Sequence, residues 1–105
     1  MHDPINSEEL KNLLEKNPDA TVLIDVRRNS DFEADNCLIP GAQRRDPEQV
    51  DIWSKDLPRD KAVVVYCVRG GSVSQSVAEK LTANQIQVRF LEGGITAWKQ
   101  LTGEP

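Results

Sequence analysis

The sequence predicts an α/β fold with a mainly parallel sheet, and three observations support this. Residues 21–26 and 62–66 are nearly continuous apolar runs rich in β-branched residues, a pattern typical of strands buried on both faces of a parallel sheet. Segments with helical periodicity follow the runs, as parallel strands require. The length of 105 residues suits one domain, so we expect residues 1–105 to form a single domain.

The first helix is predicted from a well-marked start. Asn6 can cap the helix, and Glu9 stands three positions later, as a capping box requires. Ile5 and Leu10 occupy the positions of a hydrophobic staple. The Asn-Pro-Asp sequence at 17–19 should end this helix before the first strand.

The middle of the chain shows shorter signals. Residues 29–34 are polar with one aromatic side chain and favour a helical turn, and residues 39–42 predict a bend beside a short strand. Asp46 followed by Pro47 is typical of a helix N-cap and first helical residue. The side chains of that helix expected to face inward are Val50, Trp53 and Leu57.

The second half continues the alternation of strand and helix. Periodicity predicts a helix over 73–84 with one apolar face and a strand over 87–91. Two glycines then turn the chain into a closing helix over 95–101, which should bury Ile95 and Trp98.

Charge and cysteine content limit the classes of function. The formal net charge is −4, which argues against nucleic acid as a main partner. No stretch approaches the roughly 18 apolar residues of a membrane span, and the N-terminus lacks a leader pattern. Cys37 and Cys67 are too few for a disulfide framework and lack metal-ligand spacing. We therefore expect a cytoplasmic protein with no metal, no cofactor, and no nucleic-acid or membrane partner.

The candidate site follows the second apolar strand. Cys67 stands at the carboxyl end of that strand, where ligands bind in open α/β sheets. Two glycines give the following turn backbone freedom, and Ser72 with Gln75 has the spacing of a capping box. The amides of residues 68–73 would then surround a point above the thiol, and the helix dipole would favour a thiolate or a bound anion. A buried structural cysteine is the alternative interpretation.

Three segments together form a more specific pattern. They are Asp25-Val26-Arg27 followed by Phe32 and Ile39-Pro40-Gly41-Ala42; Tyr66-Cys67 with the loop to Ser72; and Leu91-Glu92-Gly93-Gly94-Ile95-Thr96-Ala97-Trp98. In this order, and over nearly the whole chain, they resemble the rhodanese family of sulfurtransferases.

The resemblance implies a five-stranded, mainly parallel sheet flanked by helices on both faces. It also implies a ping-pong reaction in which Cys67 takes a sulfane sulfur from thiosulfate or a low-molecular-weight persulfide. The resulting persulfide passes that sulfur to a thiol acceptor or to cyanide, and the loop amides hold the terminal sulfur. The substrate-binding residues expected on this basis are Val68, Arg69, Gly70, Gly71, Ser72 and Arg45.

The sequence departs from the family pattern in two places. Residues 35–38, Asp-Asn-Cys-Leu, replace the Gly-His that commonly precedes Ile-Pro-Gly-Ala, so the local geometry there is open. Related phosphatases and arsenate reductases have five residues between the cysteine and an oxyanion-binding arginine. Val73 occupies that arginine position here, which favours sulfur transfer over phosphate chemistry.

Several polar residues near the site have two interpretations. Asp25 either orients the loop amides and pairs with Arg27, or simply caps its strand, and Arg27 is interpreted as structural. Arg28 and Arg44 are interpreted as a solvated basic face, with the binding of a small anionic ligand as the alternative. Cys37 is interpreted as an incidental loop cysteine, although it could form a disulfide with an oxidised Cys67.

Two further hypotheses remain open at this point. A non-catalytic or regulatory binding module of the same shape is possible, but inactive members usually lack the cysteine that is present here. A thiol-based redox enzyme is the third possibility, and only Cys37 supports it.

Overall fold

The computed structural model describes residues 3–58 and 60–103. Within this part of the chain the five strands form one parallel sheet in the order β1-β5-β4-β2-β3. The strands are β1 (Asp3–Ile5), β2 (Thr21–Asp25), β3 (Gln43–Arg44), β4 (Ala62–Tyr66) and β5 (Val88–Leu91). The α-helices are α1 (Ser7–Lys16), α2 (Asn29–Ala34), α3 (Val50–Trp53), α4 (Ser72–Ala83) and α5 (Gly94–Thr102). Short 3-10 helices lie at Pro18–Ala20, Pro47–Gln49 and Ser54–Asp56.

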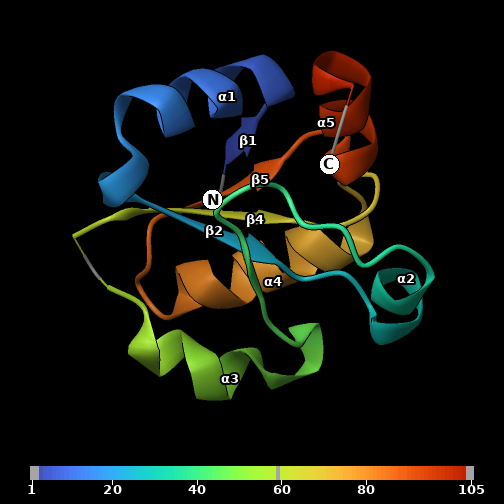
Figure 1. Ribbon diagram of the computed structural model, residues 1–105. Coiled ribbons are helices and arrows are strands. Elements are labelled where there is room, and N and C mark those ends of the chain that lie inside the picture. The colour runs from blue at the N-terminus through green and yellow to red at the C-terminus, as the bar shows by residue number, and fades with distance from the viewer. Residues whose placement is uncertain (1–2, 59, 104–105) are drawn as a thin grey trace.

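Helices cover both faces of the sheet. Helices α1 and α5 lie on one face and α3 and α4 on the other, while α2 lies at the side of the sheet (Figure 1). Along β4, Val63 and Val65 pack into the core on the α3–α4 side, and Val64 and Tyr66 pack into the core on the α1–α5 side. The expectation of a strand buried on both faces is confirmed, since these four residues are at most 1% exposed.

The start of α1 forms as predicted. The Glu9 backbone N–H donates to Asn6 Oδ1 at 2.8 Å, and the Asn6 N–H donates to Glu9 Oε1 at 3.1 Å, so the capping box is complete. Ile5 and Leu10 are both buried in the α1–α5 core. The cap therefore sets the angle at which the chain leaves the first strand.

Strand β1 was not predicted. Residues 3–5 pair with β5 in the register Asp3↔Arg89, Pro4↔Phe90 and Ile5↔Leu91. Three residues are too short to show a period, and a proline fits only because this is an edge strand. The pairing with β5 is a long-range contact, so the local sequence holds no signal for it. In the part of the chain that is described, no helix combines the length and apolarity needed to cross a membrane.

Candidate active site

All parallel strands end at one edge of the sheet, and the candidate site lies there. Strand β4 ends at Tyr66, so Cys67 is the first residue beyond it, and Tyr66 pairs with Asp25 at the end of β2. Cys67 is buried, with 5% exposed. The chain then turns through residues 68–71 and enters α4.

The cap of α4 differs from the prediction. Helix α4 has Gly71 as its N-cap and Ser72 as its first residue, without a side-chain capping bond. The Gln75 amide side chain instead donates to the Gly70 carbonyl at 2.9 Å. The predicted Ser72–Gln75 capping box is therefore wrong, because the loop turns one residue earlier, at Gly70, which has φ of +70°.

The Cys67 thiol forms a hydrogen bond with the side chain of Ser74. Its Oγ lies 3.2 Å from Cys67 Sγ and 3.4 Å from the Gly71 carbonyl oxygen. Ser74 is fully buried, so water does not compete for the hydroxyl. The thiol donates to this hydroxyl, and because a hydroxyl can rotate, the same group can donate to a thiolate.

Ser74 was not among the residues predicted to lie at the site. One signal was available: side chains of a helix lean toward its N-terminus, so a serine in the first turn of α4 is directed back at the loop.

Two glycines bring the loop against the start of α5. A Cβ on Gly94 would lie 2.4 Å from the Cys67 carbonyl oxygen, and one on Gly70 would lie 2.7 Å from the Leu91 carbonyl oxygen. The Ile95 N–H donates to the Cys67 carbonyl at 3.0 Å. The backbone of the cysteine loop therefore rests directly on the turn between β5 and α5, which explains why glycine is needed at residues 70 and 94.

Asp25 and Arg27 form a buried ion pair below the loop. Arg27 is 1% and Asp25 0% exposed, and Nη2 lies 2.7 Å from Oδ2. Burial alone would lower the pKa of Arg27, but the hydrogen bond and the charge of Asp25 outweigh it and raise that pKa. Arg27 also donates to the carbonyls of Asp35 at 2.7 Å and Cys37 at 2.8 Å. The unusual stretch at 35–38 is thus anchored by the arginine of the Asp-Val-Arg segment.

Tyr66 joins this buried network. Its hydroxyl oxygen accepts from the Ile39 N–H at 3.2 Å, which positions the Ile-Pro-Gly-Ala bend. Burial raises the pKa of Tyr66 far above its usual value of 10.0, and the negative charge of Asp25 raises that pKa further. The phenol therefore stays neutral.

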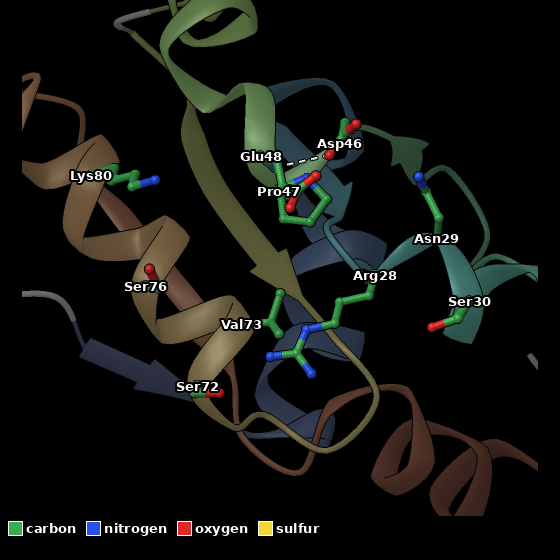
Figure 2. Close-up of a pocket in the computed structure, with 10 residues that line it drawn as sticks. All are labelled: Arg28, Asn29, Ser30, Asp46, Pro47, Glu48, Ser72, Val73, Ser76 and Lys80. Carbon is green, nitrogen blue, oxygen red and sulfur yellow. Dashed lines mark hydrogen bonds between the residues drawn. The ribbon is translucent and has the colours of Figure 1, made fainter.

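The two arginines expected near substrate, Arg69 and Arg45, both lie at the surface. Arg69 is exposed in the loop. Arg45 is exposed and donates to Gln43 Oε1 at 3.4 Å. Arg28 points toward Val73 and Ser72 (Figure 2).

Arg28 lines a cavity of about 660 Å³ at the end of the loop. The other lining residues are Asn29, Ser30, Asp46, Pro47, Glu48, Ser72, Val73, Ser76 and Lys80. Arg28 is exposed, as the interpretation of a solvated basic face expects, but it also belongs to a concave site. Only the fold brings residue 28 beside residues 72 and 73, so the sequence held no signal for this contact.

Cys37 and Cys67 are both free thiols. Cys37 is exposed, whereas Cys67 is buried.

Arg44 donates to Asn29 Oδ1 at 2.8 Å. Its guanidinium also lies over the Phe32 ring, 5.0 Å from the ring centre, and Arg27 approaches the same ring at 5.2 Å.

The fold and the site together define a class: a parallel α/β domain with a cysteine in a glycine loop between a strand and a helix. The chain belongs to the rhodanese-like domain family, whose model matches residues 6–101. The expected rhodanese-like fold is confirmed, with a sheet that is parallel throughout the described part.

Individual relatives agree with this family. A sulfurtransferase of Allochromatium vinosum is 31% identical over 93% of this chain and 89% of the relative. A tRNA sulfurtransferase of Desulfurococcus amylolyticus is 33% identical over 91% of this chain, but over only 18% of the relative. The crystal structure of a rhodanese-related protein from Thermoplasma volcanium superposes with a TM-score of 0.81 at 27% identity, covering 99% of this chain and 96% of that one.

One relative is named for a different activity. The dual specificity phosphatase ibp1 of Schizosaccharomyces pombe is 29% identical over 94% of this chain and 89% of its own length. The choice between sulfur and phosphate chemistry therefore depends on the residues of the cysteine loop.

Proposed function

We propose that this protein is a sulfurtransferase that carries a sulfane sulfur on Cys67. The observation that carries the proposal is the position of the Cys67 sulfur, beyond a buried strand and 3.2 Å from the hydroxyl of the buried Ser74. A neutral donor beside the sulfur can stabilise the thiolate before transfer and after it.

The proposed reaction has two half-reactions. The Cys67 thiolate attacks the outer sulfur of thiosulfate, an S–S bond forms to Sγ, and the S–S bond of thiosulfate breaks to release sulfite. An acceptor thiolate then attacks the outer sulfur of the enzyme persulfide, and Cys67 leaves as a thiolate. A low-molecular-weight persulfide can replace thiosulfate as the donor, and cyanide can replace the thiol as the acceptor.

The loop residues have distinct parts in this proposal. The amides of Val68, Arg69, Gly70, Gly71 and Ser72 would hold the terminal sulfur, as an oxyanion hole holds oxygen. Arg69 would attract the anionic donor, with Arg45 at the rim. Asp25 and Arg27 would support the loop from below through their buried pair.

Sulfur transfer is favoured over phosphate transfer by residue 73. A phosphatase loop needs an arginine there to bind the oxyanion, and this chain has a valine that lines the cavity. Phosphatase activity is the second candidate function, because one relative is a phosphatase.

We also propose that residues 1–105 act as one domain, and that the setting is reducing and cytoplasmic, because both cysteines are free thiols.

Mass spectrometry after exposure to thiosulfate tests the proposal. The wild-type protein should gain one sulfur atom that cyanide removes. Cys67→Ala should gain none, whereas Cys37→Ala, the matched control, should behave like wild type. If the wild type gains no sulfur from thiosulfate or from a small persulfide, the chain is a binding module rather than an enzyme. Turnover of an aryl phosphate that depends on Cys67 would replace the proposal by phosphatase activity.

A further inference from the structure

The first carbonyl groups of the cysteine loop are held by the start of α5. The Ile95 N–H donates to the Cys67 carbonyl and the Thr96 N–H to the Val68 carbonyl, both at 3.0 Å. In a planar trans peptide, the C=O and the N–H that follows it point in opposite directions. The N–H groups of residues 68–69 are therefore directed away from α5.

The Gly70 carbonyl is held from the other side, by a side chain of α4. Gln75 Nε2 donates to it at 2.9 Å, and Gly70 is buried. The same peptide geometry directs the Gly71 N–H away from Gln75. Within residues 3–58 and 60–103, none of the N–H groups of residues 68–72 donates to another group. The loop thus carries a series of unpartnered donors whose directions are set by the partners of its carbonyls.

The peptide group between Gly70 and Gly71 has the fewest restraints on its direction. A half-turn of this peptide changes φ of Gly71 from −86° to a positive value, which glycine adopts without steric cost. A Cβ built on Gly71 meets nothing within 4 Å, so this side of the loop is open. The carbonyls of Cys67 and Val68 are held by main-chain N–H groups, which no substitution removes. The Gly70 carbonyl depends instead on the side chain of Gln75.

Gly71 lies close to the sulfur. The Ser74 hydroxyl oxygen is 3.2 Å from Cys67 Sγ and 3.4 Å from the Gly71 carbonyl oxygen, so one hydroxyl group contacts both residues. The orientation of the peptide before Gly71 therefore decides whether an N–H or a carbonyl oxygen is presented beside the sulfur.

We propose that Gln75 is a positioning residue, which holds the Gly70 carbonyl and thereby turns the Gly71 N–H toward the Cys67 sulfur. In the opposite orientation the Gly70 carbonyl would face the sulfur, and its negative end would repel a thiolate or a persulfide anion. The inference rests on the proposed function where it concerns the persulfide. The contact with the thiolate does not require sulfur transfer.

Alkylation of Cys67 tests the effect on the thiolate. Gln75→Met keeps the length and the helix propensity of the side chain but removes the donor. In a Cys37→Ala background, it should slow alkylation of Cys67 by iodoacetamide roughly tenfold at pH 6, the effect of one lost hydrogen bond to an anion. At pH 10, where the thiol is ionised in both proteins, the rates should agree within about twofold.

Gln100→Met, at an exposed residue of α5, is the matched control and should react like its parent at both pH values. Equal rates for Gln75→Met and its parent at pH 6 would overturn the inference. A fall of the same size at both pH values would also overturn it, because a distorted loop changes access to the sulfur rather than ionisation of the thiol.

Nuclear magnetic resonance tests the direction of the N–H itself. In the wild-type protein, the Gly71 amide proton should move downfield as Cys67 ionises, and Cys67→Ser should abolish this movement. In Gln75→Met, the Gly71 proton should no longer follow the ionisation of Cys67. A Gly71 proton that does not respond to Cys67 in the wild type would show that this N–H does not face the sulfur.

Sulfur loading separates this inference from the proposed function. Gln75→Met should load sulfur from thiosulfate roughly tenfold more slowly than wild type. If the wild type loads no sulfur, the proposed function fails, but alkylation and the Gly71 resonance still decide the role of Gln75. If the wild type loads sulfur and Gln75→Met loads it at the same rate, the positioning role is wrong and the proposed function stands.

Discussion

The sulfur of Cys67 lies 3.2 Å from the hydroxyl oxygen of Ser74, seven residues later in the chain and on the first turn of α4. Both residues are buried. The Cys67 sulfur therefore has a neutral hydrogen-bonding partner that is held by the helix and shielded from water.

Ser74→Ala should slow sulfur loading on Cys67. The substitution removes the hydroxyl that can donate to the thiolate, and a hydrogen bond to a charged group is worth about 1.5–3 kcal/mol, so the rate should fall roughly tenfold or more. Stopped-flow or quenched mass spectrometry with thiosulfate measures this rate. Ser76→Ala is the matched control and should react like wild type, because Ser76 is an exposed serine on the same helix. Equal rates in both variants would remove Ser74 from the mechanism.

Gly94→Ala should destabilise the protein through a backbone clash. The added Cβ would lie 2.4 Å from the Cys67 carbonyl oxygen, at a residue with φ of +58°. Overpacking and strain together should lower the free energy of unfolding by about 2–5 kcal/mol, measured by urea denaturation. Gly41→Ala is the control, since Gly41 also has positive φ but nothing within 4 Å of its added Cβ. A similar loss in both variants would mean that backbone conformation, rather than contact with the loop, is the cause.

Arg27→Gln should cost much more stability than Arg44→Gln. Arg27 is buried with Asp25 and also holds two carbonyls of residues 35–37, and removing one partner of a buried pair costs about 3–5 kcal/mol. Arg44 approaches the same Phe32 ring but is only partly buried, so its loss should cost about 1 kcal/mol or less. Urea denaturation of both variants measures the difference. Comparable losses would contradict the interpretation of Arg27 as the anchor of the loop at 35–38.

The ion pair between Asp35 and Lys99 should make part of the free energy of unfolding depend on pH in the acid range. The hydrogen bond from Lys99, and then the bond from the Cys37 N–H, lower the pKa of Asp35 below its usual value of 3.8. A carboxyl with a lowered pKa in the folded state adds stability above its unfolded pKa and loses it as the pH falls through the folded pKa.

The difference in unfolding free energy between wild type and Asp35→Asn should therefore be positive at pH 6 and should shrink as the pH falls below about 4. Denaturation series from pH 3 to pH 6 measure it. Asp19→Asn, at an exposed residue, serves as the control. A difference that grows on acidification would show the opposite sign and contradict the ion pair.

Much of this fold could be predicted because its signals are local. Apolar runs predicted β2 and β4, and the Asn6–Glu9 pair predicted the start of α1. The cap of α4 was predicted one residue too late because the sequence shows which residues can cap, but not where the loop turns. Strand β1 was missed because, in the described part of the chain, it pairs with β5, which lies more than eighty residues away.

The sequence by itself determined the fold class, the position of a cysteine at a strand end, and the absence of an arginine at residue 73. These follow from periodicity, chain direction and residue type, which are properties of the chain alone. Only the tertiary structure decided that Ser74 contacts the sulfur, that Gly94 supports the loop, and that Arg28 shares a cavity with Lys80. Each of these depends on the distance between separate elements once they pack on the sheet, and such distances are set by the packing of the whole core rather than by local sequence.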